Sequence, residues 1–174
     1  MGVVRDFLNK FKNNRTNYHI LKLLSGLSPT FQKVSGKLEE NIVARESIDT
    51  IATNIAKMTP RHYQQKKNGK ILVNGDINRI LSLRPNPYMS SYDFWYKIGS
   101  FYYSQNNAYI LQDIDDKGFL IGLYPINPFF ATLVTDGYDL WLKFQFYDGN
   151  TYYIKYSEII HLRRFYNEHE FYGD

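Results

Sequence analysis

The sequence predicts an α+β fold in which amphipathic helices pack on a mostly antiparallel β-sheet or meander. Apolar residues recur at three- and four-residue intervals in two segments before residue 106, and at every second residue in most segments after it. Turn-forming residues separate the later segments, as they do in antiparallel hairpins. With 174 residues, 44% of them hydrophobic, the chain is long enough to bury the core of one cooperative domain.

The composition excludes several classes of protein. The chain has no cysteine, so disulfide scaffolds, thiolate zinc sites and cysteine nucleophiles are excluded. Its formal net charge of +4 is modest and acidic residues are interleaved with basic ones, which does not indicate a strong nucleic-acid binder. Apolar stretches stay well short of the roughly 20 residues that span a bilayer, and the N-terminus has no secretory signal pattern. We therefore expect a soluble, unexported protein with no membrane partner.

Residues 1–38 are basic and polar, with few and scattered apolar positions. This pattern predicts a flexible N-terminal arm, and residues 39–174 are expected to form the α+β domain. A basic arm could contact nucleic acid or a neighbouring subunit, although solvated terminal charge is the simpler interpretation.

Residues 39–58 predict the first long helix. Its apolar positions recur at helical spacing, while charged residues occupy the other faces. Glu39 and Glu40 lie near its start, where the helix dipole favours negative charge. Pro60 ends the helix because proline disfavours helical backbone in the preceding residue. The apolar positions are Ala44, Ile48, Ile51, Ala52 and Ile55.

Residues 61–73 predict a β-hairpin. Asn68 and Gly69 stand between two short strand-like runs, and both residues tolerate the positive φ of a tight turn. The following residues, 74–83, are compatible with a brief helix that leads to Leu81 and Leu83.

The segment around Pro85 and Pro87 predicts a corner in the chain. Both prolines fix their own φ and hold the preceding residues extended, so no helix continues through them. Ser90 and Asp93 then form a capping-box pattern at the start of a helix with an aromatic face. A proline-rich docking peptide is the weaker interpretation because the P-x-x-P spacing is absent. The helix face comprises Phe94, Trp95, Ile98, Phe101 and Tyr102.

After residue 107 the chain predicts an antiparallel meander. Runs rich in β-branched and aromatic residues are separated by turns that include glycine at 118, 137 and 149. In residues 140–146 the even-numbered apolar residues share one face, opposite Trp141, Lys143 and Gln145, as in a sheet with one buried side. The predicted strands are 108–114, 119–126, 129–135, 140–147, 151–157 and, after an interruption, 161–165.

No constellation of residues predicts catalysis. The histidines at 19, 62, 161 and 169 lack the spacing of a metal site. Asp113, Asp115 and Asp116 with Gly118 lack the ligand spacing and closing glutamate of a calcium loop, and a hairpin turn explains them. Nucleophile-elbow, phosphate-binding and dinucleotide-binding motifs are also missing from the sequence. We expect no catalytic residue, no metal and no cofactor, and a hydrolase is the least supported function.

The order of these segments resembles that of the portal proteins of siphovirus-type, tailed double-stranded DNA bacteriophages, over about residues 40–174. In that family a leucine-rich stretch ends in a Pro-Asn-Pro corner before an aromatic helix. An Asn-Ala-Tyr strand follows, with glycine commonly at the position of Asn106, and then a turn, a GLYPINP segment, an EIIHLR segment and YGD. The matching positions are Leu81, Leu83, Pro85, Asn86, Pro87, Asn107, Ala108, Tyr109, Gly118, Leu123, Pro125, His161 and Gly173.

The resemblance implies that these residues are structural and that the chain is the N-terminal, wing-like part of a portal subunit. Portal proteins form a ring, typically of twelve subunits, that replaces one capsid vertex and conducts DNA during packaging and ejection. The implied partners are other copies of the chain, terminase, capsid or scaffold proteins, head-tail adaptor proteins and double-stranded DNA. The implied location is the virion, with assembly in the host cytoplasm and no catalysis. Family members usually continue beyond YGD into stem, clip and channel regions, so the chain matches a fragment or a short relative.

A small nucleic-acid-binding module is the alternative from another functional class. It would use the basic arm and exposed aromatic side chains, which stack on single-stranded bases. Salt-sensitive binding to short oligonucleotides would distinguish it from a portal subunit, whose channel has to let DNA slide.

Overall fold

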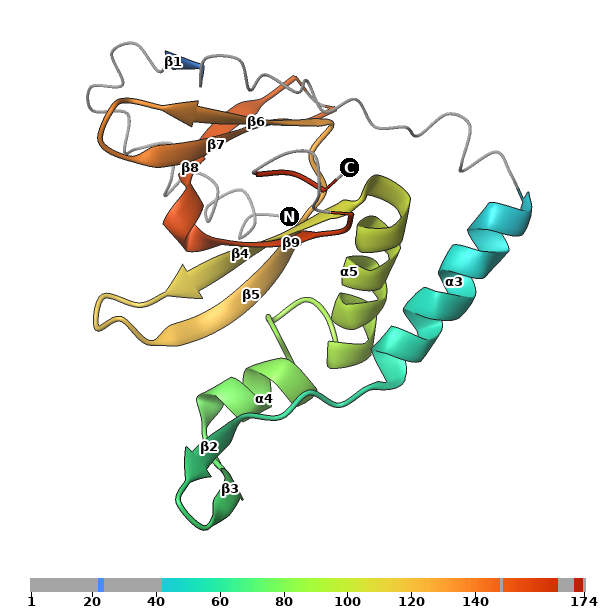
Figure 1. Ribbon diagram of the computed structural model, residues 1–174, viewed down its shortest axis with the longest axis vertical. Helices are drawn as coiled ribbons and strands as arrows, with labels where there is room; N and C mark the ends of the chain where they lie inside the picture. Colours follow the sequence, from blue (N-terminus) through green and yellow to red (C-terminus); the bar gives the residue numbers. More distant parts are fainter. Residues whose placement is uncertain (1–21, 24–41, 148, 166–170, 174) are drawn as a thin grey trace. The chain divides into compact units, whose positions relative to one another are not determined.

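The computed structural model describes residues 22–23, 42–147, 149–165 and 171–173 (Figure 1). The chain divides into two compact units. Unit 1 comprises residues 1–33 and 127–159, and unit 2 comprises residues 34–126 and 160–174. The predicted arm lies outside the described residues except for Lys22 and Leu23, as do Glu39 and Glu40.

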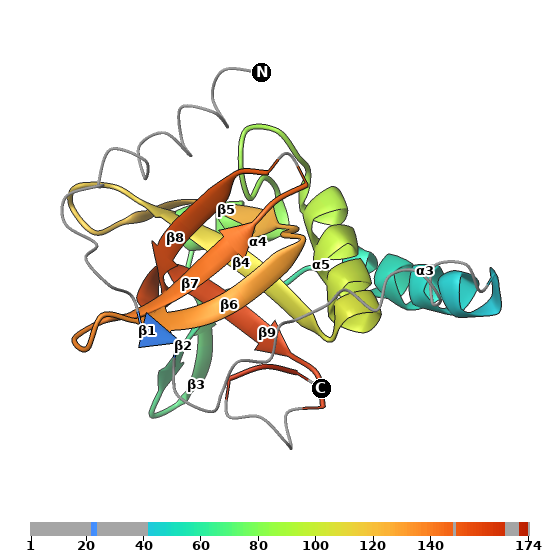
Figure 2. The ribbon, with the colours of Figure 1, turned by 90° about the horizontal axis from the view of Figure 1, so that it is seen from above.

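Unit 1 is built on one antiparallel sheet with the strand order β1-β6-β7-β8. Strands β6, β7 and β8 lie side by side and follow one another along the chain as a meander (Figure 2). A short 3-10 helix, η1, follows the last strand. The elements are β1 (Lys22–Leu23), β6 (Phe130–Thr135), β7 (Leu140–Gln145), β8 (Thr151–Lys155) and η1 (Tyr156–Glu158).

One face of this sheet is the apolar face that the two-residue period predicts. Leu142 lies opposite Leu133 on β6 and Ile154 on β8, and all three side chains are buried. Trp141 corrects the prediction of a polar opposite face, because it is only 6% exposed. Its indole N–H donates to the carboxylate of Asp136 at 3.2 Å. The Lys155 ammonium lies 5.2 Å from its ring centroid. The indole N–H and the ring face therefore each have a polar partner.

Unit 2 combines three helices, a hairpin and a three-stranded sheet. Its sheet has the order β5-β4-β9, so β9 lies beside β4 although some fifty residues separate them in sequence. The elements are α3 (Ile42–Lys57), β2 (Tyr63–Lys66), β3 (Gly69–Leu72), α4 (Asp76–Ser82), α5 (Ser91–Gln105), β4 (Asn107–Ile114), β5 (Leu120–Ile126) and β9 (Ile159–Arg163).

The prediction of one continuous meander was therefore wrong, while the α+β fold class is confirmed. The chain leaves the β4–β5 hairpin after Ile126, builds the separate sheet of unit 1, and returns to pair with β4. The last strand begins at Ile159, directly after η1, and not at His161 as predicted. Local periodicity identifies strands but does not say which strands pair, so the sequence could not reveal that β9 pairs with β4.

The core of unit 2 lies between α4, α5 and the β4–β5 hairpin. The aromatic face predicted for α5 is confirmed, because Phe94 and Ile98 are buried in this cluster and Trp95, Phe101 and Tyr102 pack against it. The other buried members are Ile80 of α4, Ala108 and Ile110 of β4, and Leu123 of β5.

Both ends of α5 follow the predicted local chemistry. The Ser90 side chain accepts from the Asp93 N–H at 3.2 Å, and the Asp93 carboxylate accepts from the Ser90 N–H at 3.3 Å, which completes the capping box. Asn106 ends the helix in the left-handed region with φ 55°. Asparagine tolerates this conformation better than other residues with a Cβ, which explains why glycine suits the same position.

Helix α3 packs closely on α5 through small residues. Ala52 and Ala56 are its buried positions, and a Cβ at Gly99 of α5 would lie only 3.2 Å from the Ala52 Cα. The Tyr96 hydroxyl of α5 donates to the Asp49 carboxylate at 2.5 Å. Ile51 was predicted on the buried face but is 37% exposed. Within the described residues, the helices are too short or too polar to cross a membrane.

We expect Ala52→Leu to destabilise the protein by about 1–3 kcal/mol, because the larger side chain has no space beside Gly99. Urea unfolding followed by circular dichroism measures this free energy. Arg45→Leu is the matched control, since Arg45 is exposed on the same helix, and it should change stability by less than about 0.5 kcal/mol. Equal stability of the two variants would contradict the close packing of α3 on α5.

Candidate functional site

Most of the residues that the family resemblance singled out fall into two groups in unit 2. One group forms the corner at Pro85, Asn86 and Pro87, which contacts Leu123 of β5. The other surrounds Asn107 and brings it into contact with His161 and Gly173. Asn86 and Asn107 are the buried polar residues of the described chain, at 3% and 1% exposure. Such residues require hydrogen-bond partners, and both have them.

The Pro-Asn-Pro corner joins α4 to α5. A bridge between Asn86 and Met89 closes a tight turn in which Pro87 and Tyr88 are the central residues. The Asn86 side-chain oxygen accepts from the Tyr88 N–H at 3.0 Å, which fixes the turn. At the end of α4, the Leu81 carbonyl accepts from the Ser91 hydroxyl at 2.8 Å and from the Trp95 indole at 3.1 Å.

The corner also covers part of the free edge of β5. The Pro85 carbonyl accepts from the Leu123 N–H, and the Asn86 side-chain amide donates to the Leu123 carbonyl, both at 2.8 Å. Leu123 therefore directs both backbone groups away from β4, in an edge strand. Pro125 has the same orientation two residues later, and the edge tolerates its missing N–H.

The Asn107 side chain ties the start of β4 to two distant segments. Its oxygen accepts from the Gly173 N–H at 2.9 Å and lies 2.8 Å from the His161 Nε2. Its amide nitrogen donates to the carbonyls of Gln105 at 3.1 Å and Gly173 at 3.2 Å. Next to it, the Arg164 N–H donates to the Asn106 carbonyl at 2.8 Å.

These contacts determine that the Nε2 nitrogen of His161 carries a hydrogen. A backbone N–H can only donate and a carbonyl can only accept, so the bonds to Gly173 and Gln105 orient the Asn107 amide without ambiguity. Its oxygen can only accept, and His161 therefore carries a hydrogen on Nε2 and donates it. The ring also stacks on Tyr109, with centroids 4.5 Å apart.

The surroundings of His161 keep its imidazole neutral. Burial lowers the pKa of His161 to about 3, with a smaller contribution in the same direction from the positive charge of Arg163. A histidine with such a low pKa cannot exchange protons near neutral pH, so it does not act as a general acid or base there. Its role in this site is to donate one hydrogen bond and to fill space.

Gly173 can only be glycine in this arrangement. A Cβ at this position would overlap the carbonyl oxygens of Asn106 and Arg164 and would lie 2.7 Å from the Arg164 nitrogen. The backbone of residues 171–173 therefore packs directly against the backbone before the start of β4 and after the end of β9, with no room for a side chain at residue 173. Tyr172 beside it is buried and packs edge-on against the His161 ring.

The remaining predicted positions lie away from these two groups. Ala108 is in the core of unit 2, and Gly118 occupies the β4–β5 turn with φ 84°, where its conformation requires glycine. His62 is on the β2–β3 hairpin, while His19 and His169 are outside the described residues. In the described part of the chain, no group of three histidine or acidic residues could hold a metal ion.

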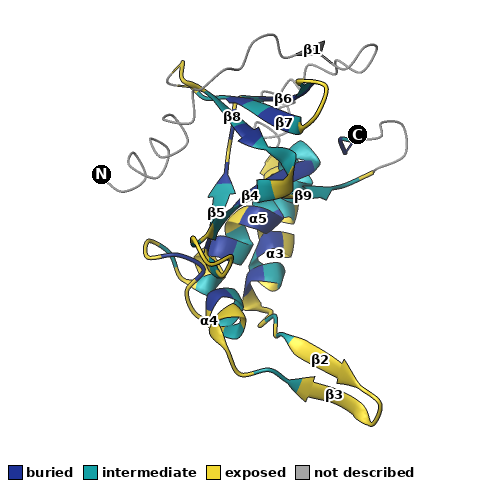
Figure 3. Ribbon diagram, turned by 90° about the vertical axis from the view of Figure 1, so that its left-hand side faces the viewer, coloured by how far each residue is buried: buried dark blue, intermediate teal, exposed yellow. Residues whose placement is uncertain are grey.

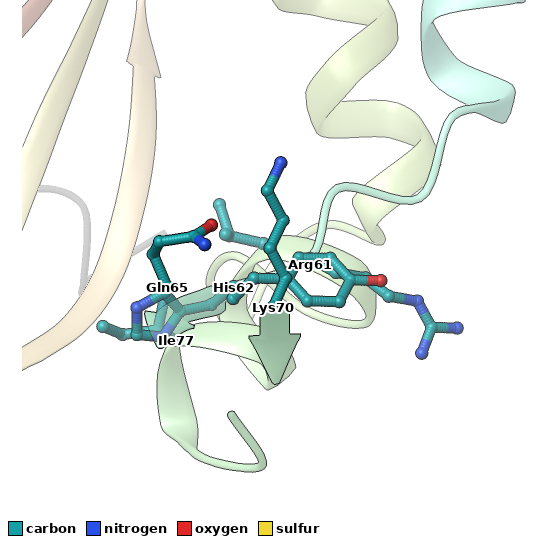
Figure 4. Close-up of a pocket in the computed structure, with 7 residues that line it drawn as sticks. Arg61, His62, Gln65, Lys70 and Ile77 are labelled. Carbon is teal, nitrogen blue, oxygen red and sulfur yellow. The ribbon is translucent and has the colours of Figure 1, made fainter. Parts of the chain in front are cut away.

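The sequence interpretation missed a basic pocket at the β2–β3 hairpin. The hairpin itself was predicted correctly, but residues 60–75 also contain four lysine and arginine residues and no acidic residue. This run was visible in the sequence and signals a positive surface. The pocket has a volume of about 430 Å³ (Figure 4) and is lined by Arg61, His62, Tyr63, Gln65, Lys70, Ile77 and Leu81.

Every group around Asn86 and Asn107 described above holds backbone segments together, which is a structural role within the fold. Comparison with known families agrees with this. Residues 42–174 match the family model described as phage portal protein. The chain therefore belongs to the phage portal protein family.

Solved structures of phage-like particles share the fold. The neck of an empty GTA particle computed with C6 symmetry has a TM-score of 0.62 at 17% identity, and the match covers 78% of this chain and 36% of that chain. The virion of a native gene transfer agent particle gives 0.62 and 17%, with 79% and 36% covered. The neck of the native GTA particle computed with C12 symmetry gives 0.60 and 17%, with 78% and 35% covered.

This chain thus spans about a third of the length of the structures it matches. A search among curated proteins finds no significant match. Family membership indicates a structural role.

We expect Gly173→Ala to weaken the attachment of residues 171–173, because the added methyl group overlaps the Asn106 and Arg164 backbone. The loss should be at least about 2 kcal/mol, since it also costs Asn107 its two hydrogen bonds to the Gly173 backbone. Urea unfolding measures it. Gly75→Ala is the matched control because nothing lies within 4 Å of a Cβ there and its φ is extended. Similar values for both variants would contradict this site.

We expect the free energy of unfolding to fall as the pH drops below about 6.5, because the folded state keeps His161 neutral. Above that pH neither the folded nor the unfolded state binds this proton, so the contribution is fully present. Between about pH 6.5 and 3 the unfolded state binds it and the folded state does not. The contribution therefore falls by about 1.4 kcal/mol per pH unit until the folded pKa is reached.

His161→Gln tests this origin, because a glutamine amide can donate to Asn107 but does not titrate. Free energies of unfolding from urea titrations at pH 7, 6, 5 and 4 are compared for the two proteins. The wild-type curve should fall more steeply than that of His161→Gln by about 1.4 kcal/mol per pH unit between pH 6 and 4. Parallel curves would show that His161 is not kept neutral by the fold.

Proposed function

We propose that this chain forms the N-terminal part of a portal subunit, which assembles with other copies into a ring at one capsid vertex. The observation that carries the proposal is the family match over residues 42–174, together with the fold that the chain shares with proteins in particle necks. Two of those structures were computed with C6 and C12 symmetry, which supports a ring of identical subunits.

The bonding of the two asparagine groups supports a scaffold role. A ring subunit has to hold its surfaces in fixed positions against neighbours, and buried, fully paired polar groups specify one arrangement of the backbone. Asn86 does this shortly before helix α5, and Asn107 does it shortly after the helix ends. The proposal assigns no catalysis to the chain.

The remaining partners follow from the family and not from a contact in this chain. Terminase, capsid or scaffold proteins and head-tail adaptor proteins would bind the outside of the ring, and double-stranded DNA would pass through its channel. The proposed location is the virion, with assembly in the host cytoplasm. A modest net charge of +4 fits a protein past which DNA slides, because a channel that grips phosphates would impede movement.

Sedimentation velocity and negative-stain electron microscopy of the purified chain test the proposal. We expect self-association that increases with concentration and ring-shaped particles in the images. Fluorescence anisotropy with a labelled single-stranded oligonucleotide tests the nucleic-acid-binding alternative. A chain that stays monomeric at all concentrations would overturn the proposed ring, and tight binding of the oligonucleotide at low salt would then favour the alternative.

A further inference from the structure

We propose that the pocket between the β2–β3 hairpin and α4 receives the β4–β5 turn of a neighbouring copy of this chain. The inference rests on the proposed function, because it names the surface through which copies contact one another. The pocket and the turn are separate surfaces of unit 2, and their side chains complement one another in charge and polarity.

The pocket combines a cationic rim with an apolar floor. Arg61 and Lys70 contribute the positive charges, while Ile77 and Leu81 of α4 contribute apolar surface. Figure 4 shows Arg61, Lys70 and Ile77 at the place where the hairpin meets α4. No acidic residue is among those that line the pocket. An occupant that fits has a carboxylate for the rim and an apolar group for the floor.

The β2–β3 hairpin is itself largely exposed. All of its strand residues are exposed except Leu72, which is half-buried (Figure 3). Tyr63 and Ile71 are 50% and 51% exposed. Isolated two-stranded hairpins are only marginally stable in water. This one is attached to α4 through Asn78, which accepts from the His62 N–H at 2.7 Å and donates to the Val73 carbonyl.

The β4–β5 turn has the complementary composition. Between residues 113 and 119 it carries three aspartates and one lysine. Phe119, which follows the turn residues 116–118, is 65% exposed and Ile121 is 50% exposed, so apolar side chains lie next to the acidic turn. The turn holds its shape because the Asp115 carboxylate accepts from the Lys117 N–H at 2.9 Å and from the Phe119 N–H at 2.8 Å. Its backbone is thus set before any partner binds.

The two surfaces match as a knob and a socket. Phe119 would occupy the floor formed by Ile77 and Leu81, and Asp116 would lie against the ammonium of Lys70. Because the contact joins two different surfaces of the chain, it is head-to-tail. Contacts of this kind repeat around an axis and form a ring when the rotation between neighbours closes, which is the arrangement that the proposed function requires.

A nucleic acid is the competing occupant of the hairpin, because phosphates also bind lysine and arginine. The observations favour a protein partner. The rings of His62 and Tyr63 also line the pocket and could stack on a base. Ile77 and Leu81, however, add an aliphatic surface that suits an apolar side chain, and a complementary acidic and aromatic turn exists on the chain itself.

Charge exchange between the two surfaces tests the proposal on the full chain. We expect Lys70→Glu and Asp116→Lys each to weaken self-association by about fivefold or more, measured by sedimentation velocity at low salt. The double variant carrying both changes should recover most of the association, since the ion pair is restored with reversed polarity. Phe119→Ser should weaken association without changing its salt dependence. Glu46→Lys is the matched control, because Glu46 is an exposed acidic residue on α3, and it should have no effect.

The outcomes separate this inference from the proposed function. Self-association of the wild type that none of the three single variants changes would overturn the knob-and-socket contact and leave the ring intact. Single variants that weaken association without recovery in the double variant would also overturn the contact between residues 70 and 116. A wild type that does not associate at all would overturn both. Loss of duplex-DNA binding in Lys70→Glu, with association unchanged, would assign the hairpin to nucleic acid instead.

Discussion

The hydrogen bonds of one buried amide hold unit 2 in its arrangement. Asn107 binds the end of α5 through the Gln105 carbonyl, β9 through His161, and the segment at Gly173 through both backbone groups. The Gly173 N–H and carbonyl are buried and would lose these hydrogen bonds if the amide were removed, at a cost of about 1–3 kcal/mol apiece. The site therefore has a requirement that no apolar side chain can meet, and it selects asparagine for its ability to donate and accept at once.

The second buried amide works at the other side of the same sheet. Asn86 and the Pro85 carbonyl bind both backbone groups of Leu123, so the corner acts as a short substitute for a fourth strand. Unpaired strand edges invite pairing with other chains, and this cover limits the edge to defined contacts. The two buried amides thus make their hydrogen bonds within unit 2. The unit presents the charge and shape of its hairpins to other molecules.

Local chemistry predicted the helices, the β2–β3 hairpin and both ends of α5, because each depends on residues within a few positions, such as Ser90 with Asp93 or Asn68 with Gly69. It failed where distant segments choose partners. Nothing near His161 indicates that β9 pairs with β4, and Trp141 is buried because Asp136 and Lys155 approach it. The resemblance to portal proteins identified Asn86, Asn107, His161 and Gly173, but only the structure gives a physical reason for each. The acid-free run at residues 60–75 was readable from the sequence and was overlooked.

The close approach of α3 to α5 has an energetic consequence. Ala52, Ala56 and Gly99 bring two backbones together through small side chains, each of which removes less apolar area from water than the large side chains around Phe94 do. Elements with little buried area open at lower free energy than the core. We therefore expect helix α3 to open more readily than the cluster around Phe94. A contact of this kind depends on how closely the two backbones fit, so an added methyl group costs more there through overlap than it gains in buried area.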